Sequence, residues 1–147
     1  MALQDKITED QKIAMKAKDT VRLSILRMLR TQLKNEQVEK RRDLNEDEIL
    51  SNISSMIRKN KEAAEEFRAA GREDLCLKEE KEAKILYEYL PKQLNRGEIE
   101  QILSEIISDL SLSGPRDMGK IMKSAMAKMA GRAEGKIVSE IARELLN

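Results

Sequence analysis

The chain has 147 residues and a formal net charge of +1; 37% of the residues are charged, 2% are aromatic, and histidine is absent. This length suits one ordinary domain or two small helical modules, and the lack of histidine excludes a Ser-His-Asp triad, a Cys-His pair and an HExxH zinc helix. Leu, Ile, Ala and Met supply most of the apolar surface, which predicts an all-α, multihelical protein.

The amino-terminal part begins with two predicted helices. The first ends near Lys16, and the second begins at a cap formed by Asp19 or Thr20. The second helix continues through VRLSILRMLRTQLKNEQVEKRR, in which aliphatic residues recur on one broad face. Both helices are therefore expected to pack one side against a core.

Two further helices complete this part. Asn45 opens the third helix, with Glu48 in the position of a capping-box partner, and the apolar period continues for about 25 residues. We expect the second and third helices to form a long antiparallel hairpin. The fourth helix is predicted from about Glu73 to Tyr89, because Pro91 disfavours helical geometry at the residue before it.

The stretch LPKQLNRG marks a domain boundary, which divides the chain into residues 1–92 and 93–147. The second part contains three predicted short helices. The first follows a second capping arrangement, Asn95 with Glu98, the next covers about 118–130, and the last is KIVSEIARELL. The segment SLSGPRD is predicted to be a loop. We therefore expect a small three-helix carboxyl-terminal module.

The helix MGKIMKSAMAKM separates two kinds of side chain. At about 100° per residue its methionines share one stripe, while Lys120 and Lys128 lie opposite. We expect the methionine side to pack and the lysine side to face either solvent or an anion. In the following turn, Gly131 and Gly135 would permit close approach of a ligand backbone. The methionines of the stripe are Met118, Met122, Met126 and Met129.

Charge is distributed unevenly along the chain. Lys16–Arg42 contains nine basic and three acidic residues. Asp43–Asp109 contains ten basic and seventeen acidic residues, and Arg116–Asn147 contains seven basic and four acidic residues. The second helix and the tail therefore present positive surface, although the whole chain is almost neutral. Three cations share the outer side of the second helix at i, i+3 and i+7: Arg27, Arg30 and Lys34.

No stretch of the sequence forms a convincing catalytic or metal-binding motif. GRAEGK resembles a phosphate-binding loop, but it has three residues between its glycines instead of four, and Ile137 replaces the magnesium-binding Ser or Thr. Cys76 has no histidine to activate it, so we expect it to be structural or incidental. The acidic clusters lie at helix starts and on solvated faces. We expect no catalytic residue, no metal and no cofactor.

The sequence also restricts the expected location. It contains no apolar run long enough for a membrane span, and MALQDKITED lacks the basic start and the apolar stretch of a secretion signal. A single cysteine agrees with a reducing compartment. We expect a cytoplasmic protein without a membrane partner.

Three stretches together resemble a known family: MKAKDTVRLSILRMLRTQLKN, YLPKQL and MGKIMKSAMAKMAGRAEGKIVSEI. They are similar to the YqeY family of small bacterial proteins, whose domain also occurs at the carboxyl end of one of the subunits of aspartyl/glutamyl-tRNA amidotransferase. The resemblance covers essentially the whole chain and implies an all-helical fold with a small three-helix carboxyl-terminal part. The related tail domain helps to hold tRNA, while the chemistry occurs elsewhere in the enzyme.

The resemblance implies a non-catalytic protein that binds tRNA or a tRNA-enzyme complex. The basic tail would meet phosphates first, and the second helix would be the next surface. An alternative is a helical adaptor that binds a protein and no RNA. The weakest alternative is a carbon-nitrogen ligase activity inherited from the family name, for which no catalytic residue is found. The expected contacts in the tail are Lys120, Lys123, Lys128, Arg132 and Lys136.

Overall fold

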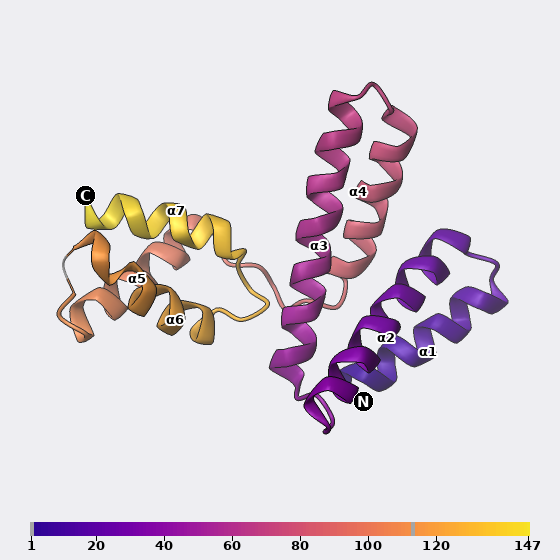
Figure 1. Ribbon diagram of the computed structural model, residues 1–147, viewed down its shortest axis with the longest axis horizontal. Helices are drawn as coiled ribbons and strands as arrows, with labels where there is room; N and C mark the ends of the chain where they lie inside the picture. The colour runs from indigo at the N-terminus through magenta and orange to yellow at the C-terminus, as the bar shows by residue number, and fades with distance from the viewer. Residues whose placement is uncertain (1, 113) are drawn as a thin grey trace. The chain divides into compact units, whose positions relative to one another are not determined.

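The computed structural model describes residues 2–112 and 114–147, and every regular element in them is a helix (Figure 1). The predicted all-α, multihelical class is confirmed. The chain divides into two compact units, Met1–Leu90 and Pro91–Asn147. In the described part of the chain, no helix combines the length and hydropathy that crossing a membrane requires.

The first unit contains four helices: α1 (Leu3–Lys16), α2 (Thr20–Lys40), α3 (Glu46–Ala69) and α4 (Glu73–Tyr87). The predicted caps are present at two of them. The Asp19 carboxylate accepts a hydrogen bond from the Arg22 amide at 3.2 Å. Asn45 and Glu48 form a reciprocal capping box, with bonds of 2.9 and 3.0 Å. These local side-chain bonds satisfy amides that have no partner inside the helix, and so fix where α2 and α3 begin.

The long hairpin is formed by α3 and α4, whereas we predicted it between the second and third helices. Figure 1 shows α3 and α4 side by side along their length, while α2 pairs with α1 and diverges from α3. Gly71 explains the pairing, because its left-handed φ of 74° allows a tight turn that returns α4 directly onto α3. The buried face of α2 is occupied by α1 and α4 as well as α3.

One hydrophobic cluster holds this unit together. It joins the buried faces of all four helices, and polar contacts lie at its edge. The Tyr89 hydroxyl donates to Asp10 of α1 at 2.6 Å. Arg22 of α2 donates two hydrogen bonds to Glu88 at the end of α4, at 2.6 and 3.3 Å. The fully buried aliphatic residues of the cluster are Ile7, Ile25, Leu26, Leu29, Leu33, Ile53, Ile57 and Leu86.

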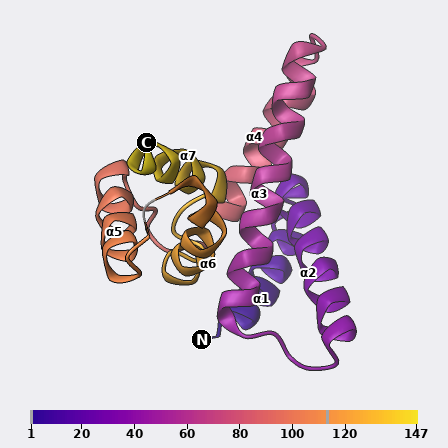
Figure 2. The ribbon, with the colours of Figure 1, turned by 60° about the vertical axis from the view of Figure 1, so that its left-hand side comes forward.

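The second unit contains α5 (Arg96–Asp109), a short 3-10 helix (Pro115–Asp117), α6 (Met118–Lys128) and α7 (Gly135–Leu146), seen from another side in Figure 2. The predicted loop SLSGPRD thus holds the 3-10 helix; its Ser113 lies outside the described residues. The Asn95–Glu98 capping box opens α5, with bonds of 3.1 and 2.9 Å. The core of the unit includes Leu103, Ile121 and Val138, one from each helix.

The segment between the units is bonded to the second one. The Leu94 amide donates to the Arg132 carbonyl at 2.8 Å, and the Gln93 side chain donates to the Gly131 carbonyl at 2.7 Å. These bonds tie the chain before α5 to the turn between α6 and α7. The segment therefore positions that turn in addition to linking the units. Separate folding of the two parts stays a prediction.

Candidate nucleic-acid interface

The packed side of α6 is rotated slightly from the methionine stripe. Ile121, Ala125 and Met129 are 0% exposed, whereas Met118, Met122 and Met126 are only partly buried against the same cluster. At about 100° per residue, Ile121 and Ala125 lie beside the stripe and move the centre of the buried face toward themselves. The periodicity of the methionines therefore predicted the packing side but missed two of its three fully buried residues.

The opposite side of α6 is a lysine surface. Lys120 and Lys123 are exposed and lie about 60° apart, roughly opposite the buried face. Lys128 is also exposed, but it lies on a flank, about 80° round the helix from Lys120. None of these three ammonium groups forms an ion pair with any residue that the structure describes. Helix α6 itself contains no acidic residue; a carboxylate, Asp117, lies directly before it at its amino cap.

The turn after α6 places the two remaining tail cations differently. Arg132 is half-buried and its carbonyl is held by Leu94, while Lys136 is exposed in the first turn of α7. Gly131 is buried and has a φ of 72°, so it serves the turn and does not offer its backbone to a ligand, contrary to our expectation. Gly135 is partly exposed, and a Cβ there would meet only Met126 Cε at 4.0 Å.

The second predicted surface lies on α2. Arg27, Arg30 and Lys34 are all exposed and fall within about 60° of one another round the helix. Arg30 Nη1 donates to Gln11 Oε1 of α1 at 2.7 Å, which is a bond to a neutral group and leaves the positive charge unpaired. In the described ranges, none of the three forms an ion pair. The structure therefore brings these three cations together on one helix face.

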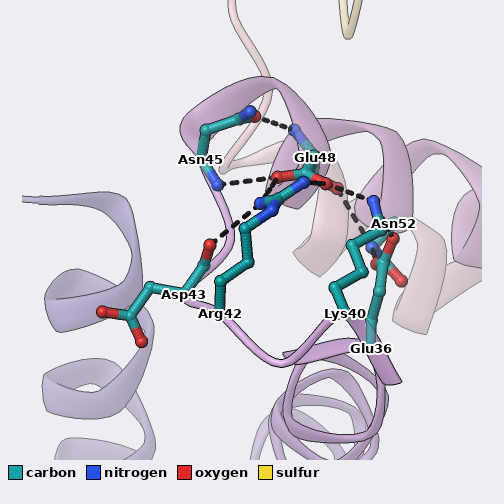
Figure 3. A network of polar contacts seen from close by, with 7 residues as sticks. All are labelled: Glu36, Lys40, Arg42, Asp43, Asn45, Glu48 and Asn52. Atoms are coloured by element: carbon teal, nitrogen blue, oxygen red, sulfur yellow. Dashed lines mark hydrogen bonds and ion pairs between the residues drawn. The ribbon is translucent and has the colours of Figure 1, made fainter. Parts of the chain in front are cut away.

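Other cations of the same basic segment are already paired inside the protein (Figure 3). The Glu48 carboxylate accepts two hydrogen bonds from the Arg42 guanidinium, at 2.7 and 2.9 Å, and one from Lys40 Nζ. It also accepts the Asn45 amide at 3.0 Å. The hydrogen bonds from Arg42 and then Lys40 hold the pKa of Glu48 well below its usual range.

Glu36 completes this network from the side of α2. It accepts a hydrogen bond from the Asn52 amide group and forms an ion pair with Lys40 at 3.0 Å (Figure 3). The Asn52 bond and then the Lys40 bond lower the pKa of Glu36. Because two carboxylates engage Lys40 and Arg42, the charge of these cations is compensated within the fold. Counting charges along the sequence did not reveal this difference.

Cys76 lies in the interior of the first unit. Cys76 is 0% exposed, and its thiol donates to Glu80 at 3.2 Å. Burial raises the pKa of this thiol, which opposes formation of a thiolate. Among the described residues, no three Cys, Asp or Glu side chains are grouped so that they could hold a metal ion.

Two fungal proteins called "Altered inheritance of mitochondria protein 41, mitochondrial" are similar to this chain. The one from Lachancea thermotolerans is 32% identical over 112 residues, which are 74% of this chain and 60% of that protein. The one from Pyrenophora tritici-repentis is 26% identical over 144 residues, or 96% of this chain and 79% of that protein. The chain thus spans less than two thirds of the length of the first of these relatives.

An archaeal protein is also similar. A subunit of glutamyl-tRNA(Gln) amidotransferase from Thermococcus sibiricus is 31% identical over 144 residues, which cover 92% of this chain but 22% of that subunit. The family described as Yqey-like protein matches residues 4–146. This match extends over both compact units and includes both lysine-bearing and arginine-bearing surfaces. The chain therefore belongs to the YqeY family.

Proposed function

We propose that this protein binds structured RNA, either tRNA or a tRNA-enzyme complex, in the cytoplasm and without catalysing a reaction itself. The observation that supports this function is the lysine surface of α6, where Lys120 and Lys123 are exposed on a helix without acidic residues. A ligand with closely spaced negative charges complements that surface. Lys128, Arg132 and Lys136 extend it along the flank and into α7.

The composition indicates how the RNA is recognised. The chain has one Phe, two Tyr and no Trp, which is too few for a platform on which unpaired bases stack. Tyr89 is buried and Tyr87 packs against the core of the first unit. Recognition therefore depends on phosphates and on the shape of a folded RNA.

The similarity to a subunit named for glutamyl-tRNA(Gln) amidotransferase supports the choice of tRNA as the first ligand to test. Only 22% of that subunit is covered, so its reaction is not transferred to this chain. Burial raises the pKa of the Cys76 thiol, and no histidine is present to activate it, so this cysteine is a poor nucleophile for acyl transfer. A binding role agrees with these features better than a ligase role.

The test is the salt dependence of tRNA binding by the purified protein. The logarithm of the binding constant falls as the logarithm of the salt concentration rises, and we call the steepness of this fall the salt slope. Each phosphate contact that is lost lowers the salt slope by about 0.7–0.9. We expect Lys120→Gln with Lys123→Gln to lower the slope by up to roughly two units. Arg96→Gln is the matched control, because Arg96 belongs to the same unit but pairs with Glu100 at 2.8 Å and also with Glu144.

The rival function is that of a protein adaptor. Binding experiments with the same purified protein distinguish it from RNA binding. A partner that stays bound after ribonuclease treatment, together with no retardation of tRNA by the parent protein, would replace RNA binding by protein binding. An unchanged slope in the double lysine variant would remove the α6 surface from the RNA site.

A further inference from the structure

The exposed side of α2 carries more unpaired charge than the three predicted cations. Arg41 caps the carboxyl end of α2, 14 residues after Arg27, and it is exposed. Within the part of the chain that the structure describes, Arg41 forms no ion pair. The row of exposed cations therefore continues to the end of α2, over a length of roughly 21 Å at 1.5 Å per residue. We call the set the α2 ridge: Arg27, Arg30, Lys34 and Arg41.

The three consecutive basic residues at the end of α2 are used in different ways. Lys40 and Arg42 are both bonded to Glu48, as Figure 3 shows. Arg41 lies between them at the carboxyl cap, with a left-handed φ of 57°. The chain turns at this residue, so Arg42 reaches the start of α3 and Arg41 does not join the network. One charge of this run is thus available to a ligand while its neighbours are compensated.

The acidic residues of α2 lie away from the ridge. Glu36 and Glu39 are about 140–160° round the helix from Lys34. They line a polar hollow of about 410 Å³ between α2 and α3, together with Asn35 and Ser55. A phosphate chain that follows the ridge therefore meets cations along one side of α2 without meeting these carboxylates.

We propose that the α2 ridge is a second phosphate-binding surface for the same RNA, distinct from the lysine surface of α6. This inference rests on the proposed RNA-binding function. It adds Arg41 to the contacts and assigns part of the binding to the first unit. Since the two surfaces belong to two linked units, occupation of one raises the effective concentration of RNA at the other.

The neighbouring arginines supply a matched pair of variants. Arg41→Gln and Arg42→Gln remove the same charge one residue apart, but only Arg41 belongs to the ridge. In tRNA titrations at several salt concentrations, we expect Arg41→Gln to lower the salt slope by about 0.7–0.9 and Arg42→Gln to leave it unchanged. The triple variant Arg27→Gln, Lys34→Gln, Arg41→Gln is expected to lower it by roughly two to three units. Circular dichroism confirms that each variant is folded.

The outcomes distinguish failure of the proposed function from failure of the ridge alone. If the parent protein does not bind tRNA, both the proposed function and this inference are overturned. If it binds and Arg41→Gln keeps the parent slope, only the ridge is overturned. An equal loss in Arg41→Gln and Arg42→Gln also rejects the ridge, because net charge alone would then explain binding. Loss of a ribonuclease-resistant protein partner in Arg41→Gln, with unchanged tRNA binding, assigns the ridge to a protein instead.

Discussion

Asn60 Nδ2 donates to Glu82 Oε2 at 3.0 Å, and this contact separates two differently packed halves of the α3–α4 hairpin. Both residues are buried, with exposed fractions of 7% and 5%. On one side, the hydrophobic cluster extends as far as Ile57 and Ala83. On the other side, the fully or nearly buried side chains are Ala64 and Cys76, and neither belongs to that cluster.

The distal half of this hairpin, residues 61–81, is expected to open more readily than the rest of the first unit. It buries little apolar surface, and its polar contacts, such as those of Arg68 with Glu65 and Glu80, are partly exposed and therefore weak. Amide hydrogen exchange should show faster exchange in residues 61–81 than in the proximal halves of α3 and α4. Uniform protection along both helices would contradict this expectation.

Removing one member of the Asn60–Glu82 contact should be more harmful than removing both. Asn60→Leu leaves a buried carboxylate without its amide partner, so we expect a loss of about 1–3 kcal/mol in the free energy of unfolding. Asn60→Leu combined with Glu82→Met continues the apolar core and should recover much of this loss. A double-mutant cycle from urea unfolding measures the coupling. Additive losses would show that the contact contributes nothing as a pair.

The Glu48 network should make the first unit less stable in acid. Bonding to Arg42 and Lys40 lowers the pKa of Glu48 in the folded state, so its contribution is present above the unfolded pKa, about 4.3, and is lost as the pH falls below it. Glu48→Gln should therefore be less stable than the parent at pH 7, with a difference that shrinks toward pH 3. Urea unfolding at both pH values gives the comparison.

A carboxylate outside the network provides the control for this effect. Glu39 lies on α2 and is exposed, and among the residues seen in the structure it has no ion-pair partner. Glu39→Gln should change the stability little at either pH. A difference between parent and Glu48→Gln that stays constant from pH 7 to pH 3 would reject the role of the ionised carboxylate.

The packing of α6 predicts an order among its apolar residues. Ile121 is fully buried, so Ile121→Ala should lower the free energy of unfolding by about 2–5 kcal/mol. Met122 is partly buried, so Met122→Ala should lower it less, although Met122 belongs to the predicted methionine stripe and Ile121 does not. Thermal unfolding of the two variants tests this order. A larger loss of unfolding free energy in Met122→Ala would show that the buried face is centred on the methionines.

Local signals in the sequence predicted the element boundaries better than the contacts between elements. The pairs Asn45–Glu48 and Asn95–Glu98 are separated by three residues, and their bonds depend only on the backbone between them. The choice of α4 as the partner of α3 depends on how several apolar faces share one core, which periodicity does not determine. The spacing of apolar residues therefore identified the buried face of a helix but not the helix that packs against it.

The candidate site shows the same limit at the level of single charges. Spacing grouped Arg27, Arg30 and Lys34 correctly, because all three lie within one regular helix. Arg41 was not singled out from its two basic neighbours, since their difference arises at a left-handed cap and from Glu48 in the next helix. The sequence did contain one signal that these cations could be paired. Glu48 stands at the capping-box position three residues after Asn45, and such a carboxylate also attracts nearby cations.

Limited trypsin digestion should first cut the chain after Lys92. Pro91 and Lys92 are exposed and lie outside any helix, between two units with separate hydrophobic clusters. The next residues are less accessible, because Gln93 and Leu94 are bonded to the turn at Gly131 and Arg132. The cut therefore leaves those bonds within the carboxyl-terminal fragment, and we expect both fragments to stay helical after separation. Mass spectrometry locates the cut, and circular dichroism of each fragment tests its folding. First cleavage within α5 or α6, or unfolding of both fragments once separated, would show that the two units depend on each other.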